Sequence, residues 1–116
     1  MFPMFVKLAG RPVLVAGAGA VGEEKIRSLL DTGARIRVVA LRASESVHRW
    51  AEEGCIVLRE RAFRPADLKG MFLVIAATSS RPVNEFIFAE AQRRGILCNV
   101  VDVPELCDFF YPAVVR

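Results

Sequence analysis

The sequence VAGAGAVGEEK, residues 15–25, places three glycines between an apolar run and a helical pattern. Gly17, Gly19 and Gly22 are spaced as G-x-G-x-x-G, an arrangement that joins the first strand of a βαβ unit to its helix. The first glycine permits a tight turn, the second lets backbone N–H groups approach a diphosphate, and the third lets the helix pack closely on the strand. Because a helix N-terminus also favours negative charge, we predict that this loop holds a dinucleotide.

Apolar runs of strand length recur outward from this loop and alternate with helical patterns. These runs cover residues 12–17, 35–41, 55–60, 71–78 and 96–103. Near-continuous hydrophobicity is typical of parallel strands whose two faces are both covered. Residues 1–116 are therefore predicted to form a single α/β domain with a doubly wound parallel sheet, a Rossmann fold. Right-handed crossovers predict the strand order 3-2-1-4-5, with a ligand crevice between the first and fourth strands.

Helix boundaries follow from capping residues and glycines. The first helix is expected over residues 20–31, and the second begins at Ser44 or Ser46. The last helix begins at Ser79 or Ser80, with a proline in its first turn. Three of its side chains are expected to pack inward: Phe86, Ala89 and Ala91.

Composition narrows the class of protein. The chain has 116 residues, 53% hydrophobic and 25% charged, and a net charge of +3 from basic residues that are scattered along it. We expect no nucleic-acid partner, and no membrane partner because no segment approaches the roughly 20 apolar residues of a spanning helix. Cys55, Cys98 and Cys107 form no CxxC pair, so no metal site or disulfide framework is predicted and a reducing cytoplasm is expected.

The end of the second predicted strand bears on the choice between NAD and NADP. Ala40 and Leu41 stand where an acidic residue commonly binds the ribose of NAD. Arg42, the next residue, could pair with a 2′-phosphate and favours NADP mildly. It could equally be a solvated loop arginine.

Candidate reacting groups lie after the fourth and fifth runs. Thr78 and Ser79 are small hydroxyl residues expected beside the nicotinamide half of a dinucleotide, although Ser79 could instead cap a helix. Asp102 ends a buried run and could act as a general base or bind a metal, or merely form a turn. His48 falls within a helical pattern, where a surface position is expected, and no catalytic triad is available.

Three segments together resemble a known family. They are GRPVLVAGAGAVGEEKIRSLLDTGARIRVVA (10–40), FLVIAATSSRPVN (72–84) and CNVVDVPELCDFFYPAVV (98–115). They resemble the amino-terminal domain of siroheme synthase and the stand-alone precorrin-2 dehydrogenases, some of which are also sirohydrochlorin ferrochelatases. The resemblance implies NAD-dependent oxidation of precorrin-2 to sirohydrochlorin, with Fe²⁺ insertion as a possible second activity.

The resemblance also implies roles for particular residues. Asp102 matches the active-site aspartate of the family, Ala20 and Val21 match contacts to NAD in the loop, and Leu41 and Arg42 match contacts after the second strand. It favours NAD over NADP and implies a homodimer in the full-length protein. Family members continue into a dimerisation region and a helical segment that close the tetrapyrrole site, so a chain ending at Arg116 is expected to bind NAD but catalyse poorly. A regulatory module that senses NAD(H) without catalysis is the alternative.

Overall fold

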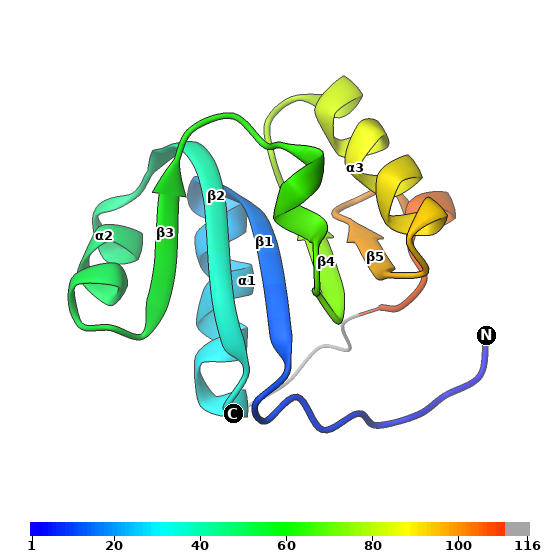
Figure 1. Ribbon diagram of the computed structural model, residues 1–116, viewed down its shortest axis with the longest axis horizontal. Helices are drawn as coiled ribbons and strands as arrows, with labels where there is room; N and C mark the ends of the chain where they lie inside the picture. The colour runs from blue at the N-terminus through cyan, green and yellow to red at the C-terminus, as the bar shows by residue number, and fades with distance from the viewer. Residues whose placement is uncertain (111–116) are drawn as a thin grey trace.

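A twisted parallel sheet organises residues 1–110, the part of the chain that the computed structural model describes (Figure 1). Its strands are β1 (Pro12–Ala18), β2 (Arg35–Ala43), β3 (Ile56–Glu60), β4 (Leu73–Ala76) and β5 (Leu97–Val100). They lie in the order β3-β2-β1-β4-β5, and each neighbouring pair is parallel. The predicted strand order and the predicted doubly wound α/β fold are confirmed. The predicted domain extends to Arg116, and its last six residues lie outside the described residues.

Helices cover both faces of this sheet. They are α1 (Ala20–Leu29), α2 (Glu45–Glu52) and α3 (Arg81–Arg93), with short 3₁₀ turns η1 (Leu30–Thr32), η2 (Pro65–Leu68) and η3 (Pro104–Leu106). One face packs against α1 and α2, and the other packs against η2 and α3 (Figure 1). No helix within residues 1–110 has both the length and the apolar character needed to span a bilayer.

The core consists of two layers, one on each face of the sheet, because successive side chains of β1 point to opposite faces. Val13 and Val15 belong to the cluster beneath α1 and α2, whereas Leu14 and Ala16 belong to the cluster beneath η2 and α3. Each of these side chains is fully buried. Burying a valine or leucine side chain stabilises a fold by about 1.5–3 kcal/mol, so this central strand holds both layers together.

Serine capping resolves two alternatives that the sequence left open. The Ser44 hydroxyl, and not that of Ser46, accepts a hydrogen bond from the Val47 N–H and caps α2. Likewise, the Ser80 hydroxyl accepts from the Val83 N–H and caps α3. Ser79 is therefore not a capping residue, and its hydroxyl is available for another partner.

The predicted inward face of α3 was partly wrong. Ala91 is buried, but Ala89 is exposed and Phe86 is 47% exposed. Asn84 and Ile87 are the other buried positions of this helix. Inward positions recur every three or four residues, so a stripe through residues 84, 87 and 91 turns positions 86 and 89 toward solvent.

Strands β4 and β5 are shorter than predicted because the chain leaves the sheet early at their carboxyl ends. The apolar runs at 71–78 and 96–103 form ladders only over Leu73–Ala76 and Leu97–Val100. After β5 the chain folds back, and Asn99 forms an isolated antiparallel bridge with Cys107. The Asp108 N–H donates to the Cys98 carbonyl at 2.7 Å, so part of this edge strand is already paired.

Candidate functional site

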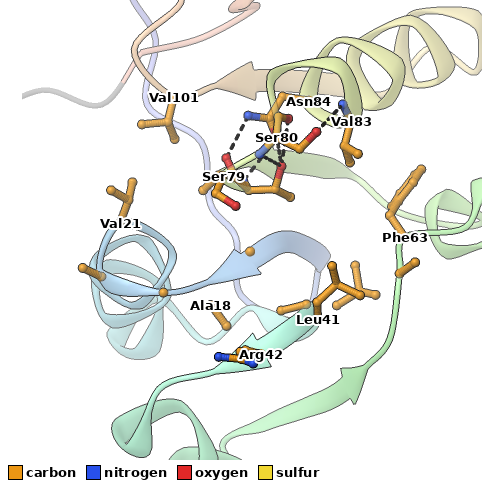
Figure 2. A pocket seen from close by; sticks show the side chains of 18 of the residues that line it. Ala18, Val21, Leu41, Arg42, Phe63, Ser79, Ser80, Val83, Asn84 and Val101 are labelled. Carbon is orange, nitrogen blue, oxygen red and sulfur yellow. Dashed lines mark hydrogen bonds between the residues drawn. The ribbon is translucent and has the colours of Figure 1, made fainter.

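A cavity of about 620 Å³ opens at the carboxyl ends of the strands. Its lining comes from six segments: residues 17–21, 39–42, 61–63, 77–80, 83–84 and 101–102. Figure 2 shows Leu41 and Phe63 on one side of it and Val21 and Val101 on the other. Ligand pockets typically measure about 300–1,000 Å³, and in open α/β sheets they occur at this edge, where the strand order reverses.

Two of the three glycines are required by the fold itself. Gly17 has φ +109°, and a methyl group there would collide with the backbone carbonyl of Ala77. Gly22 is buried, and a methyl group there would collide with the carbonyl of Gly17. The first glycine thus allows β1 to approach the β4 loop, and the third lets α1 approach β1.

Gly19 has a different environment. It is the N-cap of α1 with φ −80°, a backbone conformation open to any residue. A methyl group at Gly19 would meet no protein atom within 4 Å. Nothing in the described protein therefore requires glycine here, whereas a group bound in the cavity against this backbone would.

Unpaired backbone amides surround Gly19. The first intrahelical bond of α1 runs from the Glu23 N–H to the Gly19 carbonyl at 2.8 Å. The N–H groups of Ala20, Val21 and Gly22 precede that bond, so they have no intrahelical acceptor. With the positive end of the helix dipole, they form a surface suited to an anion such as a diphosphate.

The end of β2 supplies an apolar side chain and a cation. Leu41 is 75% exposed and Arg42 is exposed, and both line the cavity. Among residues 1–110, no hydrogen bond or ion pair engages the Arg42 guanidinium. The part of the lining that β2 supplies, residues 39–42, contains no carboxylate, as the sequence indicated.

The β3–η2 loop forms a wall of the cavity that was not predicted from the sequence. Arg61 lines the cavity and forms a bidentate pair with Asp67, at 2.7 and 2.9 Å. Burial raises the pKa of Asp67, but hydrogen bonds from the Arg61 guanidinium and the Arg64 N–H outweigh it, so the pKa is lowered. Because carboxyl ends of parallel strands meet at one edge, the residues after β3 could have been included from the sequence alone.

The loop between β4 and α3 places Thr78 and Ser79 in the lining. Asn84, in the first turn of α3, also lines the cavity and hydrogen-bonds Thr78 (Figure 2). Asn84 is not among the site residues predicted from the sequence. A polar residue on the inward stripe of a helix was the only available signal.

Asp102 lies in the turn that follows β5 and lines the cavity. Its φ of +65° is the only positive value at a non-glycine among the described residues, and aspartate tolerates this region better than most residues. Backbone bonds on both sides hold the turn: Val101 N–H to Ala76 O at 3.1 Å, and Val103 N–H to Val100 O at 3.2 Å. Strained backbone of this kind clusters at functional sites.

The cavity therefore gathers the predicted site residues. Asp102 and every predicted cofactor residue except Gly22 line it, and Gly22 packs closely against Gly17, which does line it. His48 lies outside, paired with Glu60 at 2.7 Å between α2 and β3. Across residues 1–110, no group of three or more His, Cys, Asp or Glu side chains could hold a metal ion.

Comparison with known proteins agrees with this geometry. Residues 4–113 match the family described as "Putative NAD(P)-binding". This chain belongs to that family. It is 43% identical over 113 residues to the siroheme synthase of Methylococcus capsulatus and 50% identical over 113 residues to that of Ectopseudomonas mendocina. Both matches cover 97% of this chain and 24% of the relative, so the chain spans about a quarter of the length of these relatives.

Solved structures extend the comparison to the fold. The chain matches SirC, precorrin-2 dehydrogenase, with a TM-score of 0.79 and 27% identity, over 100% of this chain and 54% of that one. A second structure, the PH0520 protein of Pyrococcus horikoshii, matches with a TM-score of 0.60 and 20% identity, over 84% of this chain and 28% of that one. The second match shows the fold alone. The family resemblance expected from the three sequence segments is confirmed.

Proposed function

We propose that this family member binds NAD⁺ in the cavity and forms the dehydrogenase part of an enzyme that oxidises precorrin-2 to sirohydrochlorin. One observation carries the proposal: Gly19, where an added methyl group would meet no protein atom within 4 Å, and Asp102 line the same cavity. The similarity to siroheme synthases and to a precorrin-2 dehydrogenase supports this choice of reaction.

The lining residues fit the parts of a dinucleotide. Amides of Ala20 and Val21 at the start of α1, beside Gly19, suit the diphosphate. Leu41 and Arg42 lie at the end of β2, the side that receives the adenosine ribose in this architecture. We propose NAD⁺ in preference to NADP⁺ because the family resemblance favours it, although Arg42 leaves a cation at this end.

The proposed chemistry removes a hydride and a proton from the tetrapyrrole. NAD⁺, when bound, supplies the hydride acceptor. Asp102 is exposed and lines the cavity, and its carboxylate can accept the proton or orient the substrate. Thr78 and Ser79 have small side chains, which leave room for a substrate to approach from their side of the cavity.

Partners and setting follow from the same proposal. Precorrin-2 and sirohydrochlorin are polycarboxylates, and the net charge of +3 suits their approach. Fe²⁺ insertion into sirohydrochlorin is a second proposed activity, with Fe²⁺ as substrate. We propose that the complete protein is a homodimer whose further segments close the site, and that it works in the cytoplasm, where its three free thiols would persist.

The test combines binding and turnover. NAD⁺ binding is titrated by calorimetry into wild type, Asp102→Asn and Asp102→Ala, and anaerobic oxidation of precorrin-2 is followed in the complete protein. Glu105→Gln, which removes an exposed carboxylate outside the lining, is the matched control. We expect the Asp102 variants to retain NAD⁺ binding and lose at least about 100-fold in turnover, as a general base contributes about 10²–10⁴. Full turnover in Asp102→Ala would refute the role of this carboxylate.

A nucleotide-sensing module predicts a different outcome of the same experiment. It would bind the dinucleotide and show no tetrapyrrole oxidation in the complete protein. Failure of the wild type to bind either NAD⁺ or NADP⁺ would remove both proposals.

A further inference from the structure

Asn84 directs all of its side-chain hydrogen bonds to one residue of the cavity wall. Its Nδ2 donates to the Thr78 carbonyl at 3.1 Å, and its Oδ1 accepts from the Thr78 N–H at 3.2 Å. The Thr78 hydroxyl lies 2.5 Å from the same Oδ1. Asn84 is 9% exposed, so these bonds form away from bulk water. Asn84 on α3 thereby hydrogen-bonds the backbone N–H, the backbone carbonyl and the hydroxyl of Thr78.

Further hydrogen bonds hold the rest of the β4–α3 loop. The Thr78 Oγ1 accepts from the Ser80 N–H at 3.2 Å, and the Ser80 hydroxyl caps α3. Figure 2 shows Ser79 and Ser80 beside Asn84 on this wall. Within residues 1–110, Ser79 makes no hydrogen bond through its hydroxyl or its backbone N–H. The loop is held on either side of Ser79, whose own donors remain available to a ligand.

The position of this loop indicates which part of a ligand it meets. The diphosphate site lies at the start of α1, and the adenosine side lies at the end of β2. The β4–α3 loop lies on the opposite side of β1 from β2, because the sheet order is β2-β1-β4. Thr78 and Ser79 therefore belong to the nicotinamide half.

We propose that Asn84 is a positioning residue that holds the Thr78–Ser79 loop in the conformation that binds the nicotinamide riboside half of the dinucleotide. This inference rests on the proposed function. An asparagine suits the position because it offers an acceptor and a donor on one planar group. Aspartate has the same shape, but its second oxygen would face the Thr78 carbonyl and repel it.

The test compares two ligands that share a diphosphate. NAD⁺ and 5′-ADP both reach the glycine loop and the β2 side, and only NAD⁺ reaches the β4–α3 loop. Binding of each ligand is measured by calorimetry for wild type, Asn84→Asp and Asn84→Ala. We expect NAD⁺ affinity to fall at least about tenfold, from the loss of hydrogen bonds at a buried group, and 5′-ADP affinity to stay within about twofold.

Gln92→Ala is the matched control. Gln92 lies on the same helix, and its Nε2 donates to Asp108 at 2.6 Å, away from the cavity. The control should leave both affinities unchanged. Asn84→Asp preserves the side-chain volume, so the affinities for NAD⁺ and 5′-ADP can still be compared in this variant if Asn84→Ala does not fold.

Two outcomes would overturn the inference. An equal loss of NAD⁺ and 5′-ADP affinity would mean that Asn84 only supports the fold. Unchanged NAD⁺ affinity would mean that the loop binds the nicotinamide riboside half without the hydrogen bonds between Asn84 and Thr78. Absence of NAD⁺ binding in the wild type would instead count against the proposed function, so the two failures are distinguishable.

Discussion

Replacing Gly19 with alanine separates a glycine kept for a ligand from one kept for the fold. The added methyl group meets no protein atom within 4 Å and the φ of −80° is allowed for alanine. The same change at Gly22 drives a methyl group into the backbone carbonyl of Gly17, which cannot rotate away as a side chain could. Gly19→Ala should therefore affect binding, and Gly22→Ala should affect folding.

The expected stability change at Gly19 is small because two effects oppose each other. Alanine is a poorer N-cap than glycine by roughly 0.5–1 kcal/mol. Replacing glycine also reduces the entropy of the unfolded chain, which stabilises by about 0.4–1 kcal/mol. The net change should lie within about 0.5 kcal/mol, which for a domain of this size is a Tm shift of no more than about 4 °C.

The expected effect on binding is much larger. Gly19 lines the cavity beside Ala20 and Val21, whose N–H groups have no intrahelical acceptor, so a methyl group there would occupy space proposed for the diphosphate. If it displaces a diphosphate from one charge-assisted hydrogen bond, the loss is about 1.5–3 kcal/mol. This corresponds to an affinity for NAD⁺ that is roughly 10- to 150-fold weaker.

Calorimetric titration with NAD⁺ and thermal unfolding of both variants provide the assay. Gly22→Ala should unfold at a markedly lower temperature, because overpacking against backbone costs about 1–3 kcal/mol or more. Wild-type affinity in a folded Gly19→Ala protein would refute the placement of the diphosphate at this loop. Unfolding of Gly19→Ala would refute the assignment of this glycine to ligand binding.

Three further predictions concern charge and thiol chemistry. The folded-state pKa of Asp67 lies below its ordinary value of 3.8, so its stabilisation is complete above that value and is lost as the pH falls through the folded pKa. Asp67→Asn should therefore flatten the acid limb of stability measured by urea unfolding between about pH 5 and 2, and an unchanged slope would contradict the contribution of the Arg61 pair. Burial raises the pKa of the Cys98 thiol to about 12, so a thiol reagent should label the exposed Cys55 in the folded protein and Cys98 only after unfolding. Arg42→Gln should weaken NADP⁺ binding at least about threefold and leave NAD⁺ binding within about twofold, since only NADP⁺ offers a 2′-phosphate; equal changes in both affinities would mean that Arg42 does not contact that phosphate.

Much of the architecture was predictable because it follows from patterns of residues that are close together in the sequence. Apolar runs and capping residues specify strands and helices within a few residues of themselves. Once five strands alternate with connectors, right-handed crossovers leave few topologies, and 3-2-1-4-5 was among them. The same reasoning placed Gly17, Ala20 and Asp102 at one edge, where the structure also has them.

Capping and helix facing were less predictable. Ser79 and Ser80 are neighbours of the same type, and only the conformation of the loop selects Ser80 as the cap of α3. Phe86 was expected inside from its hydrophobicity, but it is 47% exposed and packs edge-on against Phe63 with ring centroids 6.2 Å apart. Hydrophobicity identifies residues that can be buried, and the start of the helix determines which of them are.

The sequence alone thus determined the strands, their order and the glycine loop. The strands and the loop follow from local patterns, and the rule of right-handed crossovers supplies the order, although Val13 pairs with Leu73 far along the chain. Tertiary structure alone decided that Arg61 lines the cavity while paired to Asp67, and that the side chain of Asn84 hydrogen-bonds Thr78. It also set the left-handed backbone of Asp102. These features depend on how a loop meets the elements around it in space, and hydrophobic periodicity carries no information about such contacts.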